Sequence, residues 1–380
     1  MSRPALARVD LTALVHNYRL ARMLHGNRAL AVIKANAYGH GALACAKALQ
    51  NEADGFGVAF LDEAIPLRQS NISKPILLLE GVFDENELAE ASRSKLWIVV
   101  HNEDQVRMIE LAGNNISQLN VWVKIDSGMH RAGFRPTQTK NIYSRLLSSR
   151  RVSKVTFMTH FSCADEPGKD VTCRQIASFE LATNGIVCEQ SLANSSAILS
   201  FPVSHRDWAR PGILLYGGIA PQAKDLRLLP VMTLESAIMG VKTLQKGDSV
   251  GYGEIYVASR TTRVGLVAIG YADGYPRSAK QGTPILVDGM RTILVGRVSM
   301  DMLTVDLTEL PHCGMGSKVV LWGDGLSVVD VADSAGTISY ELLANVKRVK
   351  FQYVDAHSNH ARSQAPLFPP NVYCLHGYPA

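Results

Sequence analysis

Eight short apolar runs in the first part of the chain restrict its fold more than any other feature. They lie at residues 29–33, 56–60, 76–79, 96–100, 121–125, 155–159, 186–192 and 208–215. The stretches around them, such as 12–24, 103–111 and 172–182, have the periodicity of amphipathic helices. Strands that alternate with helices build parallel sheets, and eight such units make a (β/α)8 barrel. We therefore predict an α/β fold with a (β/α)8 (TIM) barrel. An open doubly wound sheet is the alternative, because the run at 186–192 is weak.

The pattern changes after about residue 225, where β-rich runs follow one another without long helical stretches. These runs lie at residues 231–244, 262–269, 285–298, 303–307 and 319–322. The pair Asp288-Gly289 divides one of them and is typical of a β-hairpin turn. We predict that residues 1–225 form the barrel and that residues 226–356 form a mostly-β C-terminal domain. Residues 357–380 are rich in proline and histidine without periodicity, which predicts a disordered tail.

Composition narrows the possible functions. The net charge is +5, and the basic residues are spread along the chain, which favours small anionic ligands and disfavours nucleic acid. The six cysteines form no C-x-x-C pair, so we expect reduced thiols and no metal site. The amino-terminal residues lack the apolar core of a secretory signal, and no run reaches the length of a membrane span. We expect a cytoplasmic protein.

Reactive groups in a (β/α)8 barrel sit where the strands end. The polar side chains at the predicted strand ends are Lys34, Glu80, His101, Lys124, Asp126, His160, Asn194 and Arg210. This cationic and hydrogen-bonding set suits a phosphate-bearing cofactor and a carboxylate substrate. Lys34 follows two apolar residues, where desolvation would favour its nucleophilic amine form. Gly39 and Gly41 in the next turn would allow a ligand to approach the backbone closely.

Several motifs occur at these positions and beyond them. The barrel region carries AVIKANAYGHG around Lys34, KIDSGMHRAGF at 124–134, THFSCADE at 159–166, ANSSAIL at 193–199 and WARPGILLYG at 208–217. The later region carries SVGYGEIY, GYADGYPR, GRVSMDM and ISYELL. From about residue 6 to residue 355, the chain resembles the alanine racemase family of fold-type III pyridoxal-phosphate enzymes. The resemblance implies an isomerase that interconverts L- and D-alanine and supplies D-alanine for peptidoglycan synthesis.

The resemblance assigns most of the barrel residues to the cofactor, pyridoxal 5'-phosphate. Lys34 matches the lysine that binds it covalently. The other matching cofactor contacts are Tyr38, His160, Asn194, Ser195, Arg210, Gly212, Ile213 and Tyr340. His160 would pack against the pyridine ring, and Arg210 would face its nitrogen. Because arginine does not give up a proton at neutral pH, that nitrogen would stay unprotonated, which favours racemisation over transamination.

The substrate contacts implied by the resemblance come from both parts of the chain. They are Arg131, Tyr271, Met300 and Asp301. The guanidinium of Arg131 suits a planar carboxylate. Lys124 matches a lysine that is carbamylated in some family members, where the carbamate orients the arginine. Ser299 stands where the family often has cysteine.

Racemisation needs a proton removed from one face of Cα and returned to the other, and two bases on opposite faces can do this. The resemblance gives Lys34 the proton of D-alanine and Tyr252 the proton of L-alanine. In the family, the residues that match Tyr252 and Met300 reach the active site of a partner subunit. The resemblance therefore implies a head-to-tail homodimer with two shared sites.

Three other functions fit parts of this pattern. A broad-spectrum or serine racemase would use the same residues. A barrel-type amino-acid decarboxylase shares the two-domain plan, but SVGYG and GRVSMD disfavour it. A non-catalytic pyridoxal-phosphate carrier would resemble the barrel alone. Both a biosynthetic and a catabolic role are compatible with the motifs.

Overall fold

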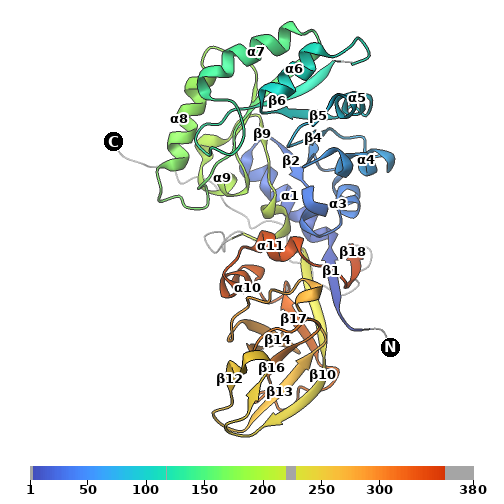
Figure 1. The fold of residues 1–380 in the computed structure, drawn as a ribbon, viewed down its shortest axis with the longest axis vertical. Coiled ribbons are helices and arrows are strands. Elements are labelled where there is room, and N and C mark those ends of the chain that lie inside the picture. Colours follow the sequence, from blue (N-terminus) through green and yellow to red (C-terminus); the bar gives the residue numbers. More distant parts are fainter. Residues whose placement is uncertain (1–2, 117, 220–227, 356–380) are drawn as a thin grey trace, which may run out of the picture.

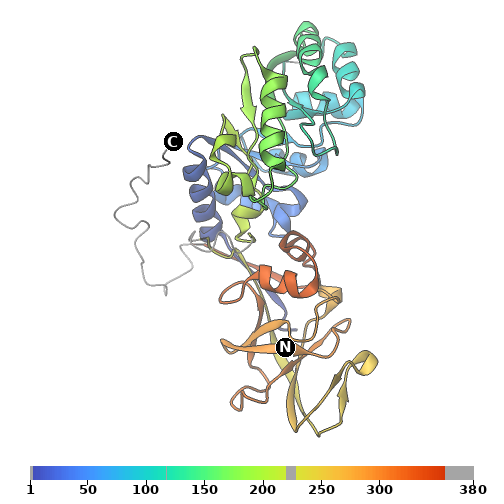
Figure 2. The ribbon, with the colours of Figure 1, turned by 90° about the vertical axis from the view of Figure 1, so that its left-hand side faces the viewer.

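The computed structural model describes residues 3–116, 118–219 and 228–355. They form two lobes along one long axis, as Figures 1 and 2 show. The tail predicted at residues 357–380 lies outside the described residues. Among the helices in the described part of the chain, none combines the length and apolarity needed to cross a bilayer.

Eight parallel strands form a barrel, which is the upper lobe in Figure 1. They are β2 (Arg28–Val32), β3 (Gly55–Val58), β4 (Ile76–Leu78), β5 (Trp97–Val100), β6 (Leu119–Lys124), β7 (Val152–Met158), β8 (Glu189–Ser191) and β9 (Trp208–Ala209). Hydrogen bonding runs in the order β8-β7-β6-β5-β4-β3-β2-β9. β8 and β9 then meet where the Ser191 hydroxyl donates to the Trp208 carbonyl at 2.8 Å and where Asn194 bridges to Arg210. The predicted barrel is confirmed in place of an open doubly wound sheet.

Helices cover the outside of the barrel. They are α1 (Leu11–His25), α3 (Ala42–Leu49), α4 (Leu61–Gln69), α5 (Glu85–Arg93), α6 (Glu103–Leu111), α7 (Thr139–Ser148), α8 (Val171–Thr183) and α9 (Ser195–Ser200). The α6 helix has the predicted bounds and begins where the Asn102 side chain accepts a bond from the Gln105 amide at 2.9 Å. The eighth apolar run, in contrast, is extended only in β9. Pro211 follows without an amide hydrogen for a strand ladder, and Ile213–Tyr216 forms a 3-10 turn.

Three tryptophans fill the barrel interior. The rings of Trp122 and Trp208 are buried with centroids 5.9 Å apart, and Trp97 packs against both. Trp97 and Trp208 are the first residues of their strands, so the cluster occupies the amino-terminal half of the barrel. Space for a ligand is therefore left at the carboxyl ends of the strands, where the active sites of such barrels lie.

The lower lobe is built on an eight-stranded, mostly antiparallel sheet. Its strands are β10 (Met232–Leu244), β13 (Thr262–Val267), β14 (Pro284–Val287), β15 (Met290–Val295), β16 (Leu303–Asp306), β17 (Lys318–Trp322), β1 (Leu6–Asp10) and β18 (Lys350–Val354). The hairpin predicted at Asp288-Gly289 joins β14 to β15, with positive φ angles of 47° and 80°. β11 (Ser249–Val250) and β12 (Tyr256–Val257) form a small separate ribbon. The helices α10 (Val328–Ala335) and α11 (Ser339–Ala344) lie at the junction with the barrel (Figure 1).

The first strand of the chain belongs to this second sheet and not to the barrel. β1 pairs antiparallel with β10 and parallel with β18, so that Leu6 lies opposite both Glu235 and Lys350. The apolar runs did not indicate β1, because its sequence LARVD alternates charged and apolar residues over only five positions. The beginning and the end of the described chain therefore meet in the lower lobe.

Candidate active site

A cavity of about 370 Å³ opens at the carboxyl ends of the barrel strands. Of the residues predicted from the sequence, it is lined by Lys34, Tyr38, Lys124, Arg131, His160, Asn194, Ser195, Arg210, Gly212, Ile213 and Tyr340. Glu80, which ends a predicted strand, also lines it. The wall is completed by apolar residues that the sequence had not singled out as site residues: Val32, Ala35, Leu79, Met158 and Ala344. The fold thus gathers side chains that lie far apart in the sequence.

Lys34 begins a turn with an unusual backbone, the element α2 (Lys34–Tyr38). Residues 35–38 all have φ between 50° and 55°, in the left-handed region that costs a non-glycine residue about 1–2 kcal/mol. Two side chains hold this turn. Glu63 accepts a bond from the Ala35 amide at 2.6 Å, and Asn36 accepts one from the Ala42 amide at 2.9 Å. The turn fixes the backbone of both Lys34 and Tyr38 at the cavity wall. The sequence had indicated these two residues and the glycines that follow, but not the left-handed backbone between them.

Tyr38 lies in a stack of aromatic rings at one end of the cavity. Its ring stacks on Tyr216 with centroids 4.9 Å apart and lies 5.8 Å from the ring of Tyr340 on α11. Tyr216 is itself fixed, because its hydroxyl donates to the Val32 carbonyl at 3.0 Å. A Cβ atom at Gly212 would overlap the Tyr38 hydroxyl. This end of the cavity therefore requires glycine at residue 212.

The Ser195 hydroxyl faces the same end of the cavity. It accepts bonds from the amides of Gly212 at 2.8 Å and Leu214 at 3.3 Å. A serine hydroxyl has two lone pairs, so its own hydrogen is left to donate to another group. Asn194 precedes it and caps α9 by accepting a bond from the Ala197 amide at 3.0 Å. A hydroxyl donor beside close-packed backbone and two tyrosines fits a phosphate group.

Arg210 is buried among neutral acceptors. Its Nη1 donates to the backbone and hydroxyl oxygens of Ser191 at 2.8 and 2.5 Å. Its Nη2 donates to the carbonyls of Thr159 at 2.5 Å and Leu192 at 3.2 Å. Burial lowers the pKa of Arg210 to about 10, which still leaves the guanidinium charged at neutral pH. Arg210 can therefore donate a hydrogen bond to a ligand but cannot accept a proton from it.

The cavity has an excess of positive charge. Lys34, Lys124, Arg131 and Arg210 line it, and Glu80 is the one acidic residue in its wall within the described chain. Burial lowers the pKa of Lys124 to about 8, against an opposing effect of the Glu80 carboxylate. Burial and the neighbouring cations also lower the pKa of His160 well below its usual range, so its ring is neutral at pH 7. These charges favour an anionic ligand.

Four predicted residues of the lower lobe do not line this cavity: Tyr252, Tyr271, Met300 and Asp301. Tyr252 is 69% exposed in the turn between β11 and β12, and Met300 is 53% exposed in a loop. The Asp301 carboxylate pairs with Arg348 at 2.9 Å. Within one chain, the structure therefore brings together the predicted cofactor contacts but not the predicted second base.

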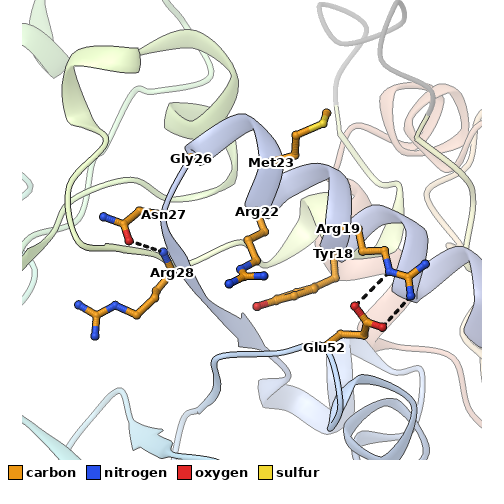
Figure 3. Close-up of a pocket in the computed structure, with 8 residues that line it drawn as sticks. All are labelled: Tyr18, Arg19, Arg22, Met23, Gly26, Asn27, Arg28 and Glu52. Carbon is orange, nitrogen blue, oxygen red and sulfur yellow. Dashed lines mark hydrogen bonds and ion pairs between the residues drawn. The ribbon is translucent and has the colours of Figure 1, made fainter. Parts of the chain in front are cut away.

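Another cavity, of about 580 Å³, lies beside the amino-terminal ends of β2 and β3 (Figure 3). Its wall includes three arginines, and each pairs with a carboxylate: Arg19 with Glu52, Arg22 with Asp54 and Arg28 with Glu189. These carboxylates offset the arginine charges, so this cavity attracts an anion less strongly than the one lined by four cations. The cavity at the carboxyl ends of the strands is therefore the better candidate for the active site.

Comparison with known proteins decides the family. Residues 9–220 match the family described as "Alanine racemase, N-terminal domain", and residues 231–353 match "Alanine racemase, C-terminal domain". The chain belongs to the alanine racemase family. A curated relative, the alanine racemase of Azoarcus sp., is 57% identical over 351 residues, which cover 92% of this chain and 99% of the relative. As a member of this family, the protein is an isomerase of the racemase type.

Solved structures of alanine racemases share the fold. The biosynthetic alanine racemase from Pseudomonas aeruginosa superposes with a TM-score of 0.90 at 47% identity, covering 93% of this chain and all of that one (100%). The alanine racemase from Bartonella henselae, solved with covalently bound pyridoxal phosphate, gives a TM-score of 0.84 at 27% identity, with coverage of 93% and 100%. Alanine racemases depend on pyridoxal phosphate, which fits the anion-binding cavity of this chain.

Proposed function

We propose that this protein is an alanine racemase that interconverts L- and D-alanine with pyridoxal 5'-phosphate bound to Lys34. The observation that carries the proposal is the cavity at the barrel mouth, where a lysine at the start of a strained, braced turn shares the wall with the hydroxyl residues Tyr38, Ser195 and Tyr340 and with a charged, buried arginine. Tyr38, Ser195, Tyr340 and the backbone of Gly212 and Ile213 would hold the phosphate. The neutral ring of His160 would pack against the pyridine ring.

The chemistry divides between the cofactor and the chain. When bound, pyridoxal phosphate supplies the electron sink that makes the Cα proton of alanine removable. Arg131 binds the substrate carboxylate and so orients Cα. On one face the Nζ atom of Lys34 takes or returns the proton, and on the other face the phenol oxygen of Tyr252 does so. Arg210 keeps its own proton and delivers none to the cofactor ring, which favours racemisation over transamination.

A head-to-tail homodimer would complete this site. Tyr252 and Met300 are well exposed and lie in the lower lobe, away from the cavity of their own chain. Two phenylalanines that follow barrel strands, Phe60 and Phe83, are also exposed, with ring centroids 5.9 Å apart. Apolar surface on both lobes suits burial against a second copy. Tyr252, Tyr271, Met300 and Asp301 would then approach the cavity of the partner subunit.

An activity assay tests the proposal directly. The purified protein, saturated with pyridoxal phosphate, is expected to racemise L-alanine and D-alanine, as followed by polarimetry. Serine and lysine are expected to turn over far more slowly under the same conditions. Equal rates with all three would favour a broad-spectrum racemase, and release of carbon dioxide without racemisation would favour a decarboxylase.

The close packing at Gly212 predicts a loss of cofactor affinity in Gly212→Ala. The added methyl group would overlap the Tyr38 hydroxyl and push it out of the phosphate end of the cavity. We expect the Kd for pyridoxal phosphate, measured by fluorescence titration, to rise about tenfold or more. Gly168→Ala is a matched control, because a Cβ there meets no atom and its φ, like that of Gly212, lies outside the left-handed region. Unchanged affinity in Gly212→Ala would contradict this picture of the phosphate end.

We also propose that Lys124 is carbamylated. Carbon dioxide reacts with the neutral amine, and with a pKa of about 8 roughly a tenth of Lys124 is neutral at pH 7. The neutral fraction rises as pH rises through this pKa. At fixed dissolved 13CO2, we expect the carbamate signal in 13C NMR to grow between about pH 6.5 and pH 8.5. The signal should be absent in Lys124→Gln, and a signal that persists there would assign the modification elsewhere.

The cellular role follows from the product. We propose that the enzyme acts in the cytoplasm and supplies D-alanine for peptidoglycan synthesis, as a biosynthetic racemase does. We also propose two domains that meet near residue 225, with β1 contributed to the second. Rescue of a D-alanine-requiring bacterial strain by this gene tests the role. Growth that still required added D-alanine would argue against this role.

A further inference from the structure

Two loops of the lower lobe are joined into one unit. The 3-10 turn Tyr271–Asp273 carries Tyr271, and the loop 299–302 carries Met300 and Asp301. The Tyr271 amide donates to the Ser299 carbonyl at 3.0 Å, and the Ala272 amide donates to the Met300 carbonyl at 2.9 Å. A Cβ atom at Gly270 would overlap both of these carbonyls. The two loops therefore move together if they move at all.

A buried carboxylate anchors this unit. The Asp273 side chain is 0% exposed and accepts bonds from Arg3 Nη1 at 2.9 Å and from the Gly270 amide at 3.0 Å. Arg348 Nε lies 3.7 Å from the same carboxylate, and Arg348 Nη2 donates to Asp301 at 2.9 Å. A buried charge is stable only when it is paired, so Asp273 holds both arginines beside the loops.

The residues around Asp273 also contact the segment that follows α11, a helix that lines the cavity of the same chain. Arg348 follows α11, whose residues Tyr340 and Ala344 line that cavity. The Lys347 amide donates to the Asp273 carbonyl at 2.9 Å, and a Cβ at Gly274 would overlap the Asn345 carbonyl. The segment 345–348 thus connects α11, which lines the cavity, with the two loops, which do not line it.

We infer that Asp273 is a positioning residue that acts across the dimer, fixing the loops with Tyr271 and Met300 for the active site of the partner subunit. This inference rests on the shared site in the proposed function. Asp273 itself touches neither cofactor nor substrate. It acts because its charge, paired with Arg3 and Arg348, keeps the two loops in one arrangement.

Asp273→Asn tests the inference, because it keeps the size of the side chain and removes its charge. Misplacing groups around a substrate by a fraction of an ångström slows a reaction strongly, so we expect kcat/KM for alanine to fall about tenfold. Cofactor affinity should stay within about twofold, since no phosphate contact changes. Hydrogen–deuterium exchange should become faster in residues 299–302. Glu309→Gln, which breaks the exposed Arg260–Glu309 pair of the same lobe, is the matched control.

Mixed dimers assign the effect to one subunit. In each, one chain carries Lys34→Ala, so only the lysine of the other chain can work. Asp273→Asn placed in the Lys34→Ala chain should lower the remaining activity about tenfold. The same change placed in the chain with the working lysine should lower it less than twofold. The reverse pattern, or equal losses, would overturn the inference. If dimers of a Lys34→Ala chain with a Tyr252→Phe chain have no activity, the shared site of the proposed function fails first.

A second variant keeps the inference testable if Asp273→Asn does not fold. Arg348→Gln removes one of the two cations at Asp273 and the pair with Asp301, and its side chain is half exposed. It should reproduce the same subunit pattern with a smaller loss. If Asp273→Asn does not fold, an Arg348→Gln dimer without that pattern would be sufficient to reject the inference.

Discussion

Lys34→Ala is expected to abolish racemisation and to remove the visible absorption band of the bound cofactor. In the proposed function, Lys34 both joins the cofactor and moves a proton at Cα, so one substitution removes two contributions. Loss of a group that acts covalently lowers kcat by roughly four to six orders of magnitude. The measurement is a pair of absorption spectra and a polarimetric rate for wild type and variant, each saturated with pyridoxal phosphate.

Lys34→Arg tests the positive charge of residue 34 separately from its covalent bond to the cofactor. It keeps a cation at the cavity mouth but cannot join an aldehyde readily, so it should also lose the band while retaining more cofactor affinity than Lys34→Ala. Borohydride trapping followed by mass spectrometry should place the adduct on the peptide that contains Lys34. An adduct on Lys124 instead, or none, would refute the assignment.

Tyr252→Phe is expected to stop racemisation while sparing one half of the exchange reaction. A single general acid–base group contributes about 10²–10⁴-fold, and racemisation in either direction needs both bases. In deuterium oxide, D-alanine should still exchange its Cα hydrogen through Lys34, whereas L-alanine should not. NMR of the two enantiomers measures this difference in Cα hydrogen exchange. Loss of exchange for both enantiomers alike would contradict the two-base arrangement.

Mixing Lys34→Ala with Tyr252→Phe should restore activity. Half of the randomly formed dimers are mixed, and each mixed dimer has one site with an intact lysine and an intact tyrosine, so about a quarter of wild-type activity is expected. This result would place Tyr252 at the site of the partner subunit. No recovery, with mixed dimers verified by mass spectrometry, would place both residues at one site in the same chain.

The barrel could be predicted because its information is local. Most barrel strands lie in apolar runs, β8 with its sequence EQS being the exception, and polar residues that line the cavity follow several of these runs. β1 could not be predicted in the same way, since LARVD is short and its partners Glu235 and Lys350 lie far along the chain. Strands held by distant partners leave little trace in local periodicity.

The candidate site likewise contains residues that local motifs predicted and features that depend on distant contacts. Residues within motifs, such as Lys34 and Arg210, were predicted and now line one cavity. The left-handed turn after Lys34 was not predicted, because no glycine occupies residues 35–38 and the brace from Glu63 is a tertiary contact. The pairing of Arg3 with Asp273 joins residues separated by 270 positions, which no motif indicates.

The position of β1 has a consequence for how the protein is made. β1 lies between β10 and β18, yet it leaves the ribosome first and β18 leaves last among the described strands. At about 5–20 residues per second, the edge of β1 that pairs with β18 stays unpaired for roughly 20–70 s, although β10 can pair with the other edge earlier. The barrel can close during that interval, whereas the sheet of the second lobe is complete only after β18 has emerged. Its completion joins the two ends of the described chain in one sheet.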